Sequence, residues 1–135
     1  MDTLSPIERS ERMRRVKARD TKPEKRLGAL VWRLGYRYRK HRRDIPGNPD
    51  LAFPGRKRAI FVHGCFWHRH DCSSGRRTPK SHARFWKKKF QRNIKRDFAV
   101  ARELRRAGWR ALVIWECQLR NTELVERKVR KFLDA

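Results

Sequence analysis

The sequence predicts an α/β domain with a mixed β-sheet, and three observations lead to this expectation. The chain has 135 residues, a length that leaves little room for a second independent core. Apolar runs centred on residues 59–62 and 111–115 are typical of buried strands. Amphipathic segments with helical spacing stand before, between and after these runs. We therefore expect one domain over residues 21–135, preceded by a basic arm over residues 1–20.

Four strands are expected between segments rich in glycine, proline and asparagine. The first three cover residues 36–40, 50–53 and 58–63. The fourth covers residues 111–115, and its near-continuous apolar character predicts burial on both faces of the sheet.

Three helices are expected from capping signals and apolar spacing. Thr21, Pro23 and Glu24 supply a capping hydroxyl, a first-turn proline and an acid near the positive helix end, and Gly35 is a plausible stop. A long helix should follow over about residues 83–107. Its expected apolar side consists of Trp86, Phe90, Ile94, Phe98, Ala101 and Leu104. The last helix is expected to bury Leu124, Val125, Val129 and Phe132.

The charge of the chain points to a polyanionic partner. The chain carries 38 lysines and arginines against 14 aspartates and glutamates, a formal net charge of +24. A surface this positive attracts nucleic acid, and it disfavours an enzyme that acts on neutral small molecules. Disorder also produces high charge, but five tryptophans and seven phenylalanines are enough to build a core.

Residues 1–20 form the expected basic arm, which has too little apolar surface to fold alone. We expect it to become ordered on a DNA backbone; a solvated tail is the alternative. The basic residues expected to contact DNA there are Arg12, Arg14, Arg15, Lys17 and Arg19. No apolar run approaches the roughly 20 residues that span a bilayer, and no secretory signal is recognisable. These features predict a cytoplasmic protein with no membrane partner.

The segment HGCFWHRHDC, residues 63–72, predicts a metal site within an irregular stretch over residues 64–82. Three thiolates and one imidazole make a closed tetrahedral set that suits structural Zn²⁺. The expected ligands are Cys65, His70, Cys72 and Cys117. Free cysteines beside surface histidines are the alternative. Because four ligands complete such a site, at least one of His63 and His68 is free for another role.

Three acids on so basic a chain predict a second, catalytic metal. Acids near bound DNA would repel phosphate unless a hard cation such as Mg²⁺ lies between them. Asp50 opens one short strand and Val62 lies near the end of the next, so the two can converge. Glu24 and Asp97 can approach from helices on either side. The alternatives are a helix-dipole acid for Glu24 and an ordinary salt bridge for Asp97.

At these residues the sequence resembles the very-short-patch repair endonucleases, which nick DNA at mismatches and have a restriction-endonuclease-like fold. The resemblance covers almost the whole chain in order, and HGCFWH followed by a distant WEC is its most specific part. The other matching segments are KARDT…EKRL, PGNPD ending at Asp50, RNIKRD ending at Asp97, and GWRALVIWEC ending at Cys117.

The resemblance implies a role for each candidate catalytic residue. Asp50 and the main-chain carbonyl of Val62 would hold catalytic Mg²⁺. His68 would activate the attacking water while Asp97 orients it. Glu24 and His63 would hold the water shell of the Mg²⁺ ion. In this chain Val62 replaces the threonine of the familiar family pattern, and the acid–x–Lys pair of many nucleases of this fold is absent.

The resemblance also implies how the chain meets DNA. Phe66, Trp67 and Trp86 match side chains that wedge into the base stack at the mismatch; core packing is the alternative for Trp86. Asn93 falls in a matching segment expected to contact DNA. The polar loop SSGRRTPKSH after Cys72 has no contacts that can be carried over.

The expected function is therefore Mg²⁺-dependent nicking of one strand of duplex DNA, 5′ of the thymine of a T·G mismatch produced by deamination of 5-methylcytosine. This cut would initiate very-short-patch repair, performed by a monomer near the nucleoid, with mismatch-repair proteins as further candidate partners. A zinc-stabilised DNA-binding module without catalysis is one alternative. A restriction or defence nuclease of the same fold is the other.

Overall fold

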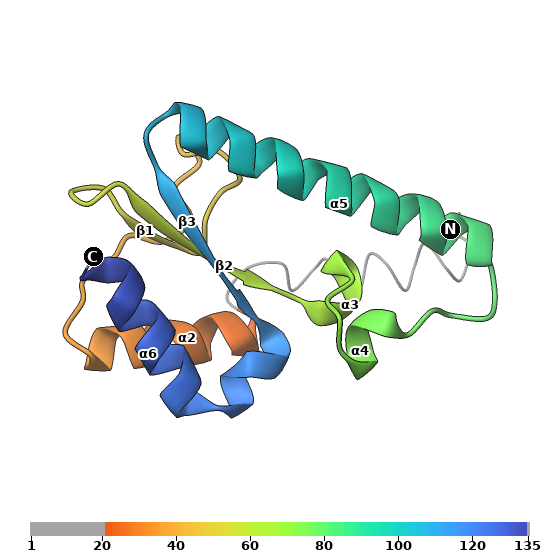
Figure 1. Ribbon diagram of the computed structural model, residues 1–135, viewed down its shortest axis with the longest axis horizontal. Coiled ribbons are helices and arrows are strands. Elements are labelled where there is room, and N and C mark those ends of the chain that lie inside the picture. The colour runs from red at the N-terminus through yellow and green to blue at the C-terminus, as the bar shows by residue number, and fades with distance from the viewer. Residues whose placement is uncertain (1–20, 135) are drawn as a thin grey trace, which may run out of the picture.

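The computed structural model describes residues 21–134, and its centre is a three-stranded mixed sheet (Figure 1). The strands are β1 (Leu51–Phe53), β2 (Arg58–His63) and β3 (Arg110–Trp115), in the order β1-β2-β3. β1 pairs with β2 in the antiparallel direction, and β2 pairs with β3 in the parallel direction. The predicted α/β class with a mixed sheet is confirmed.

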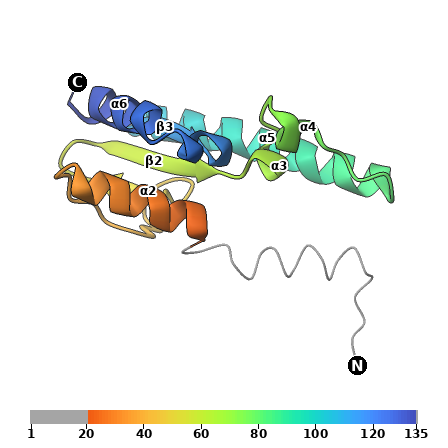
Figure 2. The same cartoon turned by 90° about the horizontal axis from the view of Figure 1, so that it is seen from below.

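Helices flank this sheet. The longer ones are α2 (Lys22–Arg33), α5 (Ala83–Arg106) and α6 (Thr122–Leu133). The short ones are α3 (Cys65–His68), α4 (Ser73–Arg76) and the 3₁₀ helix η1 (Glu116–Arg120). The N-terminal half of α5 runs beyond the sheet, alongside α3 and α4 (Figures 1 and 2).

Alternate residues of the strands enter two different cores. Ile60 of β2 packs with buried residues of α2 and α6, and the half-buried Val62 lies against the same cluster. Ala59 and Phe61 face the opposite way and pack with Leu104 of α5. The period-two alternation of a strand therefore places α2 and α6 on one face of the sheet and α5 on the other.

The first helix begins and ends where its sequence signals predict. The Thr21 hydroxyl accepts a hydrogen bond from the backbone N–H of Glu24 at 3.4 Å, and a proline lies in the first turn. Leu34 is the C-cap, and Gly35 follows with a φ of +98°, a conformation that glycine adopts without steric cost. These signals place Glu24 at the start of α2.

Two of the expected strands differ in the structure. Residues 36–40 form no strand, because only Arg39 pairs, in an isolated bridge with Ala52, and His41 then turns the chain with a φ of +53°. β3 is present, but it is not buried on both faces: only Ile114 is buried, and Ala111 is exposed. β3 is the outer strand of the described sheet, so its first half lacks the cover of a central strand.

The buried side of α5 also differs from the expected one. Ile94 and Phe98 are 36 % and 69 % exposed, whereas Asn93 is buried at 5 % and Asp97 is half-buried. The inward positions follow a repeat of four and three residues through Trp86, Phe90, Asn93, Asp97, Val100 and Leu104. A polar stretch of the helix therefore faces inward in its middle, which brings Asp97 toward the carboxyl end of β2.

The segment over residues 64–82 is irregular, as predicted, apart from α3 and α4. The arm with its five basic candidates lies outside the described residues. Among residues 21–134, no helix combines the length and apolarity that a bilayer crossing requires.

Two isoleucines test this assignment of the core. Ile60 is fully buried, so Ile60→Ala should lower the free energy of unfolding by about 2–5 kcal/mol through lost burial and an unfilled cavity. Ile94→Ala removes the same atoms from the exposed side of α5 and should change it by less than about 0.5 kcal/mol. Urea denaturation followed by circular dichroism measures both. Equal losses would mean that α5 packs through Ile94 after all.

Candidate active site and metal centre

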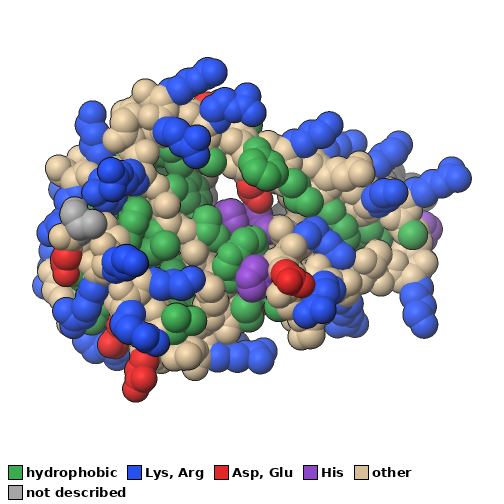
Figure 3. Space-filling view, viewed as in Figure 1, with side chains coloured by type: hydrophobic (Ala, Val, Ile, Leu, Met, Phe, Trp, Pro, Cys, Tyr) green, Lys and Arg blue, Asp and Glu red, His purple; other side chains and the backbone are tan. Residues whose placement is uncertain are grey.

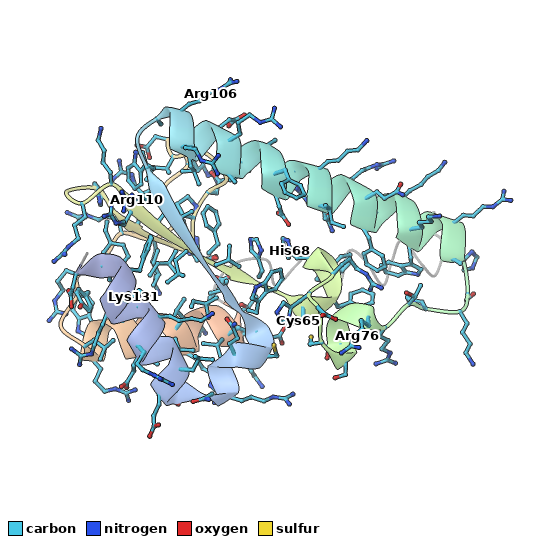
Figure 4. The ribbon with its side chains drawn as sticks, viewed as in Figure 1. Cys65, His68, Arg76, Arg106, Arg110 and Lys131 are labelled. Carbon is cyan, nitrogen blue, oxygen red and sulfur yellow. The ribbon has the colours of Figure 1, made fainter. Side chains whose placement is uncertain are left out.

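The candidate site lies at the carboxyl ends of the two parallel strands. The last pair in their register is His63 of β2 with Trp115 of β3. The chain continues from these ends into α3 and η1, and Figure 4 shows His68 and Cys65 in this region. Groups at the carboxyl ends of parallel strands converge on one edge of a sheet, where α/β proteins bind their ligands.

Asp50 lies at the same edge because β1 runs antiparallel to β2 and starts there. Its Oδ2 accepts a hydrogen bond of 2.6 Å from the backbone N–H of Val62. The register pairs Leu51 with Ile60, so its continuation places Pro49 opposite Val62. Proline has no N–H to donate. The ladder therefore cannot use the Val62 carbonyl, which in an extended strand points to the same side as the Val62 N–H.

The Asp50 carboxyl is in an environment that favours a bound cation. The pKa of Asp50 is raised to about 7: burial raises it most, the Val62 N–H lowers it, and the neighbouring Glu24 side chain raises it. Two carboxyl groups close together in a partly dry site are stabilised when a cation neutralises them. Asp50 and Glu24 therefore fit a divalent metal.

His68 and Asp97 form a hydrogen-bonded pair across two helices. The Nδ1 of His68 lies 2.6 Å from Oδ2 of Asp97, and both side chains are partly exposed, at 22 % and 30 %. The inward turn of α5 at Asp97 makes this pairing possible. An imidazole held through Nδ1 presents its other nitrogen, Nε2, as a proton acceptor or donor. The pair has the arrangement of a general base and the group that orients it.

His63 connects this pair to the sheet. Its ring stacks on that of His68, with centroids 3.8 Å apart and an interplanar angle of 8°. Burial, followed by the proximity of His68, lowers the pKa of His63 to about 4, so His63 is neutral at physiological pH. His63, His68 and Asp97 also offer ligand atoms within 4.8 Å of one another, close enough for a metal ion. The short His68–Asp97 hydrogen bond favours the acid–base interpretation of this group.

The predicted metal ligands Cys65, His70, Cys72 and Cys117 come together from α3, the following loop and η1. Their ligand atoms lie within 4.8 Å of one another. Tetrahedral Zn–S bonds of about 2.3 Å require sulfur atoms about 3.8 Å apart, so the set could hold a zinc ion.

Two hydrogen bonds shape this cluster. The N–H of Cys117 donates to Sγ of Cys65, and Gly75 donates to Sγ of Cys72, each at 3.4 Å. Burial raises the pKa of Cys65 to about 12, whereas the Gly75 N–H lowers that of Cys72 to about 7. A cation at the centre would offset the cost of burying the Cys65 thiolate.

Trp115 links the two centres. Its indole stacks on His70 of the metal cluster at 4.3 Å and meets His63 edge-on at 5.2 Å. Sequence reasoning treated this tryptophan only as part of an apolar strand and of the WEC motif, without a role of its own. The available signal was its position two residues before Cys117, at the end of the strand that pairs with His63.

The aromatic side chains expected to meet DNA form a cluster in which exposure differs. Trp86 is only 4 % exposed and stacks on Phe90, with Phe66 edge-on against it. Phe66 and Trp67 are half-buried on α3. In this structure Phe66 and Trp67 are therefore the more accessible part of the cluster, and the buried Trp86 packs against both.

Asn93 lies under the same cluster. Its Nδ2 donates to the carbonyl of Trp67 at 3.1 Å, and its Oδ1 accepts from Arg96. Both polar atoms of this buried side chain thus have protein partners, and a direct DNA contact by Asn93 stays a prediction. Sequence reasoning missed Arg96 and the inward position of Asn93. The available signal for Asn93 was its three-residue spacing from Phe90, which places it on the buried side of α5.

The charge distribution suits a polyanion. Figure 3 shows histidine side chains near the centre of the face, beside apolar groups, with lysines and arginines around the periphery. Asp50 and Asp97 are half-buried rather than exposed.

Comparison with known proteins agrees with this geometry. Residues 1–74 match the family model described as DNA mismatch endonuclease Vsr. The chain is 43 % identical over 133 residues to the type II nicking enzyme V.XorIIP of Xanthomonas oryzae pv. oryzae, covering 98 % of this chain and 97 % of that protein. It is 40 % identical over 122 residues to the DNA mismatch endonuclease Vsr of Escherichia coli, covering 90 % of this chain and 78 % of that one.

The chain belongs to the Vsr family of DNA mismatch endonucleases. The resemblance inferred from the sequence is confirmed, as are the restriction-endonuclease-like fold and DNA endonuclease activity. Similarity to a third protein, the type II nicking enzyme V.NmeAIP of Neisseria meningitidis, extends over 99 % of this chain at 36 % identity. A Vsr-family endonuclease needs a phosphodiester-cleaving site, and the residues above are its candidates.

A glycine substitution tests the metal cluster. A Cβ on Gly75 would collide with backbone atoms of His70, so Gly75→Ala should open the loop that carries two ligands. We expect bound metal, measured by mass spectrometry of the native protein, to fall by at least about half and the melting temperature to drop.

Gly55→Ala is the matched control, because a Cβ there meets no atom within 4 Å. It should keep the metal content and melting temperature of the parent protein. Equal metal content in the two variants would contradict the proposed placement of the loop.

Proposed function

We propose that this protein nicks one strand of duplex DNA on the 5′ side of the thymine of a T·G mismatch, in a Mg²⁺-dependent reaction that initiates very-short-patch repair. One observation carries the proposal: the Asp50–Val62 contact and the His68–Asp97 pair lie on adjoining segments, joined through the stacked ring of His63. The family description supports mismatch-dependent action. Nicking is the activity in the names of several relatives.

Asp50 and the Val62 carbonyl are the residues that would hold Mg²⁺, and Glu24 beside them would hold its water shell. They supply the hard oxygen ligands that this ion prefers. Mg²⁺ bound there would polarise the phosphoryl group and stabilise charge that develops on its oxygens. Val62 serves as well as threonine in this role, because the main chain supplies the ligand.

His68 is the proposed general base. Its Nε2 accepts a proton from the attacking water, and Asp97 keeps the Nδ1–H oriented and stabilises the imidazolium that results. The neutral His63 ring stacked beside His68 fixes the plane of the imidazole without adding a second positive charge.

The Cys65–His70–Cys72–Cys117 cluster is proposed to hold structural Zn²⁺. A closed set of four protein ligands leaves no position for substrate. The ion would instead fix the irregular segment that carries Phe66, Trp67 and His68, and it would offset the conformational entropy lost by ordering that segment.

Phe66 and Trp67 are proposed to unstack DNA at the mismatch. Apolar wedges separate a base step for a few kcal/mol, and this cost is smallest at a mispaired step. The two aromatics share the four-residue helix α3 with His68. Insertion at the mismatch would therefore set which phosphate reaches His68, and it would do so without a second copy of the chain.

Replacing Asp50 tests the catalytic assignment. Asp50→Ala should bind a T·G duplex within about threefold of the parent protein but nick it at least about 10³-fold more slowly, because a ligand of the catalytic cation is missing. Gel assays with labelled strands, on T·G and matched duplexes, measure both.

Asp44→Ala removes an exposed acid from the same loop, where Asp44 pairs with the neighbouring Arg42. This control should nick at the parental rate. Full activity in Asp50→Ala would refute the metal assignment, and equal cleavage of matched duplex would favour a restriction or defence nuclease.

Removing divalent ions separates the enzyme from a DNA-binding module. Brief chelation that leaves thiolate-bound zinc in place should abolish nicking, and added Mg²⁺ should restore it at unchanged zinc content. Zinc content is read by mass spectrometry in parallel with the nicking assay. Nicking that persists without Mg²⁺ would contradict the proposed mechanism. Absence of nicking under all conditions would favour the non-catalytic DNA-binding module.

A further inference from the structure

A concave surface lies beside the candidate active site. It is a groove of about 1010 Å³ between the first turn of α2, helix α3, the loop before α5, and η1. Four of its lining residues carry a fixed positive charge, and they are Lys22, Arg26, Arg77 and Arg120. Phe66, Trp67 and Trp86 form its aromatic wall. We call this surface the flanking groove.

Helix α3 separates the flanking groove from the catalytic pair. Phe66 and Trp67 line the groove, whereas His68, the next residue, contacts Asp97. A DNA duplex opened by these aromatics would thus have the cleavage site on one side of α3 and the flanking groove on the other. The occupant of the groove is then the stretch of DNA next to the unstacked step.

Glu116 is the one acid among the groove-lining residues in the described part of the chain. Its Oε2 would lie 3.7 Å from a Cβ on Gly64, a position 3.6 Å from Cδ1 of Trp67. The carboxylate and the indole therefore flank the same point of the chain. Although four cationic residues line the same groove, Glu116 has no ion-pair partner among residues 21–134.

We propose that the flanking groove binds DNA next to the mismatch, with its cations on the backbone and Glu116 accepting a hydrogen bond from the exocyclic amino group of a flanking base. This proposal rests on the proposed function. A carboxylate near phosphates weakens binding unless it gains a donor, and an ionised carboxylate only accepts hydrogen bonds. Adenine, cytosine and guanine carry amino groups, whereas thymine has none.

The charge and the wall of the groove favour this occupant over an acidic protein segment. Aromatic rings beside positive side chains are the usual surface for unstacked bases and their backbone. A carboxylate that faces an acidic peptide would only repel it. Glu116 thus gives the groove a means to distinguish flanking bases in addition to general affinity for polyanions.

The test measures binding rather than cleavage, so that it remains informative whether or not the protein nicks. Fluorescence anisotropy without added Mg²⁺ is recorded for T·G duplexes that differ at the base pairs on either side of the mismatch. At one flanking position we expect an amino-bearing base to bind at least about fivefold more tightly than a base analogue with hydrogen in place of the amino group.

Glu116→Ala should reduce this ratio to below about twofold. Glu123→Ala is the matched control, because Glu123 is an exposed acid on α6 outside the groove and its loss changes the net charge equally. It should keep the parental ratio. A parental ratio in Glu116→Ala, or no ratio above about twofold at any flanking position in the parent, would overturn the proposal.

The cationic part of the groove has its own readout. Arg120→Gln should reduce the slope of log affinity against log salt by about one, because one phosphate contact is lost. Arg106→Gln is the control, since Arg106 lies at the far end of α5 from Cys65 and His68 (Figure 4). Equal slopes in both variants would mean that DNA does not enter the groove. Failure of the parent to nick any T·G duplex is a separate result that would refute the proposed function.

Discussion

The parallel pairing of β2 with β3 is the constraint on which the rest of the molecule depends. The pairing ends with His63 beside Trp115, and both strands end at the same edge of the sheet. β1 runs the opposite way and so begins at this edge, which brings Asp50 to the N–H of Val62. The pairing of the three strands thus brings the Asp50 carboxyl, the Val62 main-chain carbonyl and the His63 imidazole to one edge of the sheet.

The segment after β2 would be poorly determined by packing alone, and its side chains do three different things within four residues. Cys65 belongs to the metal cluster, Phe66 and Trp67 to the aromatic wall, and His68 to the pair with Asp97. Trp115 packs between His70 and His63 and so ties the metal cluster to the histidines. Distortion of the metal cluster would therefore move Phe66 and Trp67 together with His68.

The sequence predicted the parts of this molecule that follow from local chemistry. The cap at Thr21 and the grouping of Cys65, His70 and Cys72 were recognisable because each depends on residue type and short spacing, and Cys117 joins that group from a distant segment. The strand expected at residues 36–40 and the exposure of Phe98 depended instead on which partners were near in space. The spacing of apolar side chains predicted the wrong buried face of α5, because the inward positions include the polar Asn93 and Asp97.

Acids are costly on a surface that binds phosphates, so the partners of each acid indicate its role. Asp97 holds His68, and Asp44 is neutralised by Arg42. Asp50 has the Val62 N–H and stands beside Glu24, a pair that a cation would stabilise. Glu116 differs, because it lies beside Trp67 with cations in the same groove and no ion-pair partner in the described part of the chain. The electrostatic reasoning that assigns Asp50 to a metal assigns Glu116 to a donor on the substrate, and an amino group is the donor that bases offer.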